Sequence, residues 1–221
     1  MLSVYTLVFN VIFEARWPGA GDTSEFALML FAGLIPFMML SEVLVAAPGI
    51  VSSQPNYVKK VVFPLPVLVV TKVGAAALTG LIGLSVLTIA KIWLTQAPTA
   101  WVLFAPVVLV EMIPMLLATG WVLSSLGVYL RDIGQFVGIV SSILLFLSPI
   151  FFPPSAMPES LSVFLHFNPL VTPIEALRSV AVTGAPPDFL ALVWHFVLSS
   201  CGAIAAYRLF RRLSRGFADV L

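Results

Sequence analysis

The residues that catalysis or metal binding would use are few in this sequence and stand far apart. His166 and His195 are its two histidines, and neither occurs in an HExxH pattern or beside an acid. The single cysteine, Cys201, lies in an apolar run, so an intrachain disulfide and a multi-cysteine metal site are both excluded. No GxxxxGK[ST] phosphate-binding loop occurs either. We therefore predict no catalytic residue, no metal site and no cofactor in this chain.

One carboxylate lies where a charge is costly. Glu111 is about ten residues into an apolar helix, or roughly 15 Å deep, where a charge costs about 2.5–3.5 kcal/mol. It can line a path or an interface, or it can be protonated or paired with Lys72 on the neighbouring helix. Glu42 falls late in its apolar run, near the headgroups. His195 lies inside the last apolar run, where packing between helices is the default role.

Composition explains why polar residues are so scarce. The chain is 60% hydrophobic and 10% charged with a mean hydropathy of +1.09, whereas soluble domains carry about 25% charged residues. A net charge of +1 offers no electrostatic footprint for nucleic acid. Helices satisfy their own backbone hydrogen bonds in a bilayer. The sequence thus predicts an all-α integral membrane protein built as a single domain over residues 1–221.

Apolar runs of about 20 residues predict the membrane spans. Residues 1–13 are apolar but too short to cross, and they lack the basic start of a signal peptide. We interpret them as the remnant of a truncated first helix, which makes six transmembrane helices in all. Glycines and alanines in 74–83, together with Gly120 and Ser124, predict close helix packing. The five complete spans are predicted at 26–51, 73–90, 101–129, 133–152 and 189–207.

Basic residues predict the orientation, because positive loops mark the cytoplasmic side. Alternate loops share a side of the membrane, and their basic residues divide seven to three. This division places the loop 52–63 and the tail 208–221 in the cytoplasm. The larger set is Lys59, Lys60, Arg131, Arg208, Arg211, Arg212 and Arg215, and the smaller set is Arg16, Lys91 and Arg178.

The loop 52–63 has two interpretations. Lys59 and Lys60 can simply anchor a cytoplasmic loop, as in almost any membrane protein. The stretch "NYVKKVV" between two prolines is also long enough for one or two helical turns along the membrane surface, a shape suited to docking a partner.

The external segment 151–188 is too polar and proline-rich to span. Thr172 is predicted to cap a helix with Pro173 first and Glu175 third. We expect two short helices that dip into the outer leaflet as a re-entrant pair and form a gate over about 154–185. Their apolar faces and turn residues are Leu161, Phe164, Leu165, Ile174, Leu177 and Val180, joined through Asn168 and Pro169.

Five stretches in this order resemble the membrane subunit of a type-2 ABC exporter, in its polysaccharide, O-antigen and teichoic-acid branch. The resemblance covers nearly the whole chain, although family members also carry an amphipathic interfacial helix and an intact first helix at the N-terminus. The stretches are "KKVVFP", "VYLRDIGQ", "LSPIFFPPSAMP", "FNPLVTPIEALR" and "RGFADVL".

The resemblance implies a partner set and a location. Two copies of this permease would pair with two copies of a separate ABC ATPase, which binds the ATP and Mg. The complex would move lipid-linked polysaccharide across the bacterial cytoplasmic (inner) membrane, with a periplasmic gate.

The resemblance also implies roles for particular residues. The family's coupling helix maps onto Asn56, Tyr57, Val58, Lys59, Lys60 and Val61. Side chains near the outer face could line the path and stack on sugars, or form the ordinary aromatic belt. These are Trp17, Phe26, Trp101, Phe104 and Phe152, with Glu111 as a possible path-lining acid.

Two other classes of protein stay open. A type-2 ABC permease for a drug or a small lipid would share the core architecture. An integral-membrane glycan or lipid enzyme would need clustered acids, histidines or arginines, whereas the basic cluster "RLFRRLSR" has no acidic partner before Asp219.

Overall fold

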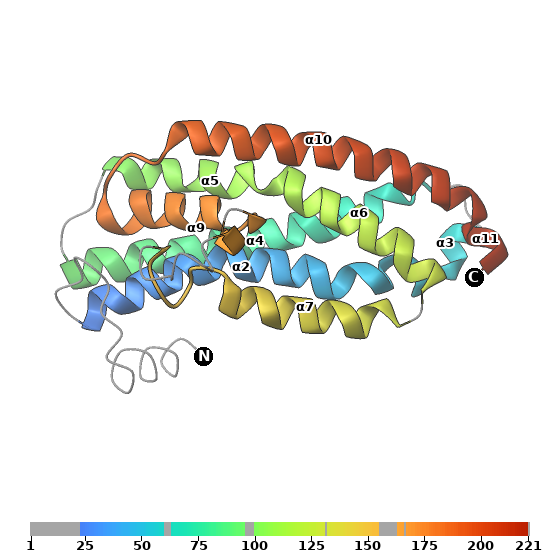
Figure 1. Cartoon of the computed structure of the whole chain (residues 1–221), viewed down its shortest axis with the longest axis horizontal. Helices are drawn as coiled ribbons and strands as arrows, with labels where there is room; N and C mark the ends of the chain where they lie inside the picture. Colours follow the sequence, from blue (N-terminus) through green and yellow to red (C-terminus); the bar gives the residue numbers. More distant parts are fainter. Residues whose placement is uncertain are drawn as a thin grey trace. The chain divides into compact units, whose positions relative to one another are not determined.

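The computed structural model describes residues 23–59, 63–95, 100–130, 132–154, 163–165 and 167–220 (Figure 1). All regular secondary structure in these ranges is helical, and the predicted all-α class is confirmed. The predicted helix remnant at 1–13 lies outside the described residues.

The described helices follow one another along the chain in this order. The first described helix is α2 (Thr23–Ser52), and the short α3 (Pro55–Lys59) precedes α4 (Pro66–Thr95). The 3-10 helix η2 (Ala100–Phe104) continues into α5 (Ala105–Glu111), α6 (Ile113–Tyr129) and then α7 (Ile133–Leu147). The remaining elements are α9 (Val171–Arg178), the π-helical turn η4 (Ser179–Thr183), α10 (Phe189–Leu213), η5 (Ser214–Gly216) and α11 (Phe217–Val220).

Within the part of the chain that the structure describes, four stretches are long and apolar enough to cross a membrane, which supports a multi-pass membrane protein. They are Ser24–Ser52, Pro66–Leu94, Ala100–Tyr129 and Phe189–Val220. The second begins at Pro66, earlier than predicted, because proline is favoured in the first turn of a helix.

The predicted span 133–152 is wrong in length. Helix α7 stops at Leu147 after 15 residues, short of the roughly 20 that a span needs. Pro149 and Pro153 lack the amide N–H that would continue the helical hydrogen bonds, and the chain turns between them.

The described residues form two compact units. The first contains residues up to Phe37, with Gly80–Leu109 and Leu144–Leu192. Its fully buried side chains include Leu30, Leu87 and Ile174. The second contains Met38–Thr79, Val110–Ile143 and Val193–Leu221, and its fully buried side chains include Met39, Leu116 and Phe210.

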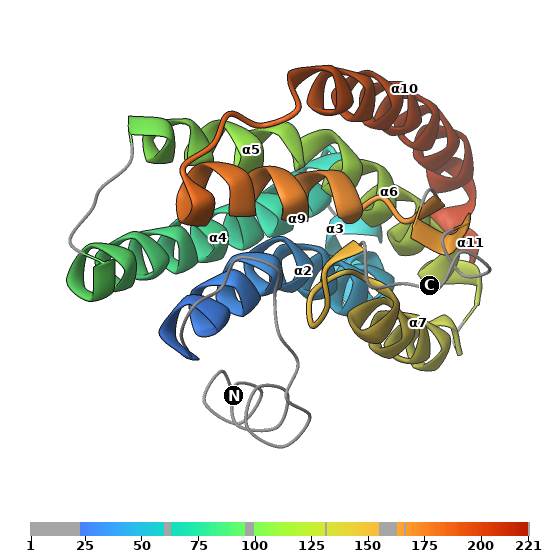
Figure 2. The same ribbon diagram turned by 60° about the vertical axis from the view of Figure 1, so that its left-hand side comes forward.

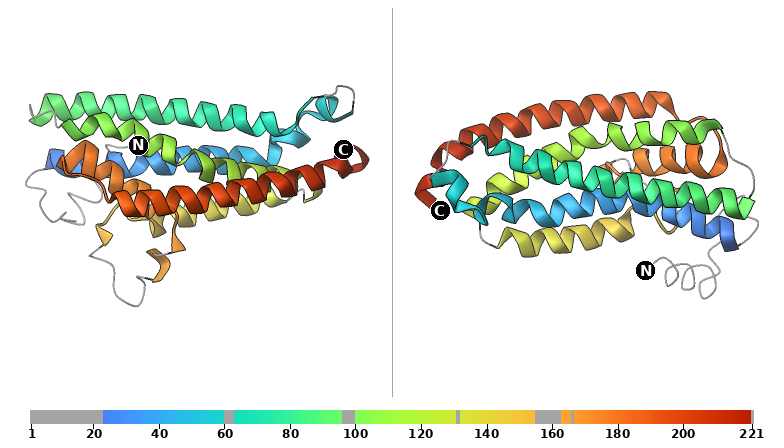
Figure 3. Two further views of the ribbon diagram at one scale, coloured as in Figure 1. Left: turned by 90° about the horizontal axis from the view of Figure 1, so that it is seen from above. Right: turned by 180° about the vertical axis from the view of Figure 1, so that it is seen from behind.

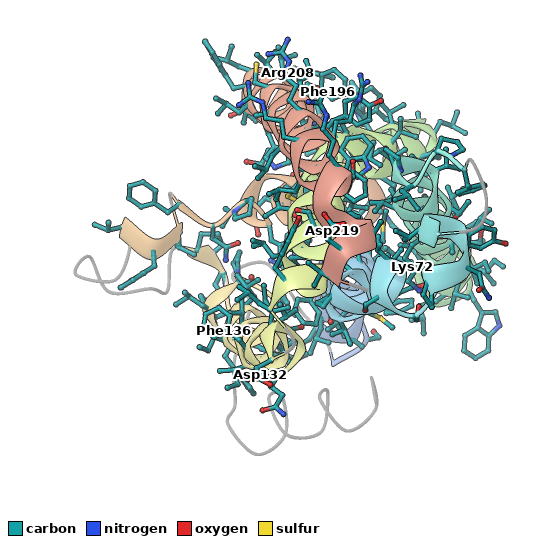
Figure 4. The ribbon with its side chains drawn as sticks, turned by 90° about the vertical axis from the view of Figure 1, so that its right-hand side faces the viewer. Lys72, Asp132, Phe136, Phe196, Arg208 and Asp219 are labelled. Atoms are coloured by element: carbon teal, nitrogen blue, oxygen red, sulfur yellow. The ribbon has the colours of Figure 1, made fainter. Side chains whose placement is uncertain are left out.

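Large apolar side chains also cover the outside of the helices. Phe136 on α7 and Phe196 on α10 both point away from their helices (Figure 4), and both are exposed. Exposed apolar residues at this density suit contact with lipid rather than water. Some hydroxyl groups on the spans are satisfied locally, because Thr79 and Ser85 donate to carbonyls one turn earlier.

Small residues allow close helix packing at some of the predicted positions. A Cβ added to Gly127 on α6 would collide with the backbone of Pro48 on α2, and one added to Gly120 would meet the Val69 side chain. Within the first unit, Gly83 faces the side chain of Ile35, so close packing is confirmed at that position as well. Gly74 faces open space, so the packing prediction is wrong at that position.

Replacing Gly127 with alanine should destabilise the protein by about 1–3 kcal/mol, because the new methyl group overlaps the Pro48 carbonyl. The matched control is Gly138→Ala on α7, where an added Cβ meets nothing within 4 Å, and helix propensity should make it neutral or slightly stabilising. Thermal unfolding in detergent measures both. Equal midpoints for the two variants would contradict the packing.

Candidate functional site

The segment of residues 168–183, here called the α9–η4 segment, begins at a side-chain turn. Asn168 accepts a hydrogen bond from the Leu170 N–H through Oδ1 at 2.9 Å, as expected for a turn residue. Helix α9 then starts at Val171 with Leu170 as its N-cap. The predicted cap at Thr172 is wrong, because Asn168 already bonds the chain before the helix and Thr172 lies inside its first turn.

Arg178, at the end of α9, is the main polar anchor of this segment. Its side chain is only 3% exposed. Its Nε donates to the Met29 carbonyl on α2 at 3.0 Å, and its Nη2 donates to the Ile150 carbonyl at 2.8 Å. Its Nη1 donates to the Pro149 carbonyl and to Glu175. One guanidinium thus joins α9, α2 and the turn that follows α7.

The ionisation of Arg178 follows from these surroundings. Burial lowers the pKa of its guanidinium, while the charge and hydrogen bond of Glu175 act to raise that pKa. Arginine keeps its proton in proteins, so the guanidinium supplies four of its five N–H groups to the contacts above. Gly33 leaves room for it, since a Cβ at that position would lie 2.7 Å from Nη2.

Two further side chains hold the same segment. Asn168 donates through Nδ2 to the buried Ser148 Oγ at 2.9 Å. Lys91, near the end of α4, donates to the Val182 carbonyl in η4 at 2.7 Å. The segment therefore has polar contacts at its start and its end, and Gly184 closes it at φ 71°.

The apolar side chains predicted to be buried in the gate 154–185 are buried in its second half. Ile174, Leu177 and Val180 are fully buried at the predicted helical spacing. Phe164, predicted to be buried as well, is 51% exposed. Leu161 lies outside the described residues.

The predicted coupling stretch 56–61 overlaps the short helix α3 at residues 56–59. Asn56 and Tyr57 are exposed and Val58 is half-buried, while the Tyr57 ring packs 4.8 Å from the Phe63 ring. The side chain of Lys59, and all of Lys60 and Val61, lie outside the described residues.

Helix α11 supports α3, and Figure 3 shows the two short helices side by side. Phe217 on α11 is fully buried and packs against the rings of Phe210 and Tyr129 at 5.6 and 5.9 Å. The Tyr129 hydroxyl donates to the Leu213 carbonyl at 2.9 Å. The stretch "RGFADVL" was part of the family resemblance but had no assigned role. Its Phe217 holds α11 against α6 and α10.

The contacts of these segments match the predicted alternation of loops. Lys91 and Val182 come from two loops assigned to one side of the membrane, and Lys91 donates a hydrogen bond to the Val182 carbonyl. Helices α3 and α11 come from the loop and the tail assigned to the other side, and they are in contact.

Glu111 has a partner that the sequence did not predict. Its Oε1 contacts the Nδ1 of His195 on α10. Lys72 pairs instead with Glu42 at 2.6 Å, so the predicted Glu111–Lys72 alternative is wrong. The second oxygen of Glu111, Oε2, is buried without a hydrogen-bond partner among the described residues. Pro114 follows in the first turn of α6, at the break between α5 and α6.

The predicted path-lining aromatics pack against other rings or are partly covered. Trp101 and Phe104 lie 6.2 and 5.5 Å from the Phe189 ring. Phe152 is half-buried and Phe26 is buried, while Trp17 lies outside the described residues. A role for Trp101, Phe104 and Phe152 in a path stays a prediction.

Comparison with known proteins places the chain in a family. The chain belongs to the ABC-2 type transporter family, whose pattern matches residues 1–182. It is similar to an O-antigen export system permease protein RfbA of Myxococcus xanthus, at 24% identity over 98% of this chain and 82% of that protein. Two such proteins of Klebsiella pneumoniae are 21% and 20% identical over 99% of this chain and 82% of their own length.

The anchoring role of Arg178 was missed, although the sequence contains a signal for it. Arg178 stands four residues after Ile174, so it shares the apolar face of α9. A charge on that face must either be paired or collect backbone acceptors. The Glu111–His195 contact has no comparable local signal, because the two residues lie on separate helices.

Replacing Arg178 with lysine should destabilise the protein by about 2–5 kcal/mol, because an ammonium cannot reach carbonyls in three directions as the planar guanidinium does. Glu175→Gln is the matched control. It removes the ion pair from a side chain that is 40% exposed and should cost less than about 1 kcal/mol.

The midpoint of thermal unfolding in the same detergent reports both changes. An Arg178→Lys protein as stable as the Glu175→Gln protein would show that the carbonyl contacts contribute little.

Proposed function

We propose that this chain is the transmembrane subunit of an ATP-driven exporter of lipid-linked polysaccharide, such as O-antigen, capsule or teichoic acid. The observation that carries the proposal is its similarity, over 98–99% of its length, to permeases named for O-antigen export. Its membership of the ABC-2 type transporter family supports a transport role rather than an enzymatic one. The exporter would act in the bacterial cytoplasmic membrane.

The assembly follows from the class of transporter. Two copies of this chain would pair with two copies of a separate ATPase subunit that binds ATP and Mg. The four long apolar stretches of the structure would cross the membrane, and residues 1–13 would be the remnant of a further helix. The seven basic residues of the loop 52–63, Arg131 and the tail support a cytoplasmic C-terminus.

A deletion strain tests the proposal directly. Without this gene, a lipid-linked glycan should accumulate on the cytoplasmic side and disappear from the cell surface, and the intact gene should restore it. A normal surface glycan, together with retention of a drug or a small lipid, would favour the alternative permease and contradict the proposal.

Coupling to the ATPase is assigned to residues 56–61. Exposed Asn56 and Tyr57 offer a docking face, and the contact of α3 with α11 supports a role in passing on movement. When the partner closes on ATP, displacement of α3 would be transmitted to helices packed on Phe217. Such transmission needs packed elements with two arrangements.

Changing Lys59 and Lys60 together to glutamate should lower partner-stimulated ATP turnover and export by at least about tenfold, the effect of about 1.4 kcal/mol, because the charge at the docking face is reversed. The matched control is Lys59→Arg with Lys60→Arg, which keeps the charge and should keep turnover. The chain alone is expected to show no ATP hydrolysis.

Because the lysines also favour a cytoplasmic loop, an accessibility label on the tail must confirm that the orientation is unchanged. Normal export by the glutamate variant, with the tail still inside, would show that the coupling assignment is wrong.

The external gate is assigned to residues 154–185. Burial of Leu177 and Val180, and the contacts of Arg178 and Lys91, support a closed segment rather than a solvated loop. In the exporter it would form a re-entrant helix pair on the periplasmic side and limit leakage while no polymer passes. Polymer passage would then require these contacts to loosen.

A cysteine at Leu177 should react with a water-soluble maleimide at least about 100-fold more slowly in the resting state than one at Ala185, because Leu177 is fully buried and Ala185 is exposed. Cys201, which is exposed, must first be replaced by serine. Reactivity at position 177 should rise when the partner binds ATP.

Equal and fast labelling at positions 177 and 185 in all states would indicate a loose loop. Pro169→Ala gives an independent check, because a gate should leak or slow down whereas a connector should tolerate the change.

A further inference from the structure

A groove between α6 and α10, here called the α6–α10 groove, has two chemically different ends. Its volume is about 730 Å³. Leu117 on α6 and Ile204 on α10 line its apolar end. Trp121 and Tyr207 lie further along, with their rings 5.1 Å apart. All these residues belong to the second unit.

The other end of the groove is strongly basic. Its lining contains Arg208, Arg211, Arg212 and Arg215, and no carboxylate. All four arginines are exposed, and Figure 4 shows Arg208 on the outer side of α10, away from Asp219. The Arg211 guanidinium lies over the Tyr207 ring at 6.0 Å, a cation–π contact that leaves its donors available.

The aromatic residues mark the level of this groove in a bilayer. The Trp121 indole N–H donates to the Pro66 carbonyl at 3.2 Å, so the ring is fixed. Tryptophan, tyrosine and arginine characterise the depth at which headgroups meet acyl chains. A basic pocket between membrane helices at this depth suits an anionic lipid headgroup.

We infer that the α6–α10 groove binds an anionic phospholipid of the membrane. The phosphodiester lies among the four arginines, and one acyl chain follows Leu117 and Ile204. Charge complementarity favours a phospholipid with net negative charge, because the arginines would repel the positively charged ammonium group of a zwitterionic headgroup. The inference needs only that the chain spans a membrane, so it stands apart from the proposed substrate.

Native mass spectrometry of the full chain in mild detergent tests the site, with phosphatidylglycerol and phosphatidylcholine of identical acyl chains as probes. Phosphatidylglycerol should be retained at least about tenfold better. Arg208→Gln with Arg211→Gln should weaken its binding about 30-fold, equivalent to about 1 kcal/mol for each arginine.

A pair of tryptophan variants on α10 keeps the test decisive if the arginine variant fails to insert. Ile204→Trp fills the groove and should abolish retention of phosphatidylglycerol. Leu198→Trp, at an exposed position of the same helix outside the groove, should leave retention unchanged.

Three results would overturn the inference. Phosphatidylcholine could be retained equally well, or phosphatidylglycerol could be retained equally by the two tryptophan variants. Alternatively, a polyprenyl diphosphate could displace phosphatidylglycerol when present at a tenth of its concentration. That result would assign the groove to an isoprenoid lipid carrier instead.

Discussion

The hydrogen bonds donated by the buried Arg178 guanidinium are the constraint on which the α9–η4 segment depends. A segment that does not cross the membrane can be buried only if its polar groups find partners within the protein. Arg178 supplies donors to the carbonyls of Met29, Pro149 and Ile150. The Met29 carbonyl lies within α2, whereas the Pro149 and Ile150 carbonyls lie in the turn after α7, where regular helical bonding has ended. Leaving such groups without partners costs about 1–3 kcal/mol each.

The second unit is held by a different kind of contact. Gly120 and Gly127 allow α6 to lie close to Val69 and to the Pro48 backbone. In lipid, van der Waals contacts at such a distance stabilise helix association. Near the tail, Phe217 is enclosed by Phe210 and Tyr129, and α11 rests on α3. Figure 2 gives a second view of these elements. A proposed ATPase contact therefore rests on a packed aromatic cluster rather than on a free loop.

The sequence predicted the features that depend on local composition, namely the spans and the buried face of α9. It predicted few of the contacts between residues far apart in the chain. Hydropathy identified the four long spans, and helical spacing predicted the buried Ile174 and Leu177. The end of α7 was predicted too late, because the hydropathy of a run does not show that Pro149 and Pro153 stop the helix. The partners of Glu111 and Lys72 could not be assigned, because several acids and bases have similar depths and only the packing of helices selects among them.

Hydrogen exchange of the reconstituted exporter tests most directly the claim that the α9–η4 segment is a closed, anchored gate. Amides of α9 and η4 should exchange at least about 100-fold more slowly than those of an unstructured peptide while the ATPase is empty. They should lose that protection when the ATPase is trapped with ATP, because the proposed passage of polymer would require the Arg178 and Lys91 contacts to loosen. Fast exchange in both states would contradict an anchored segment, and equal protection in both states would contradict a gate.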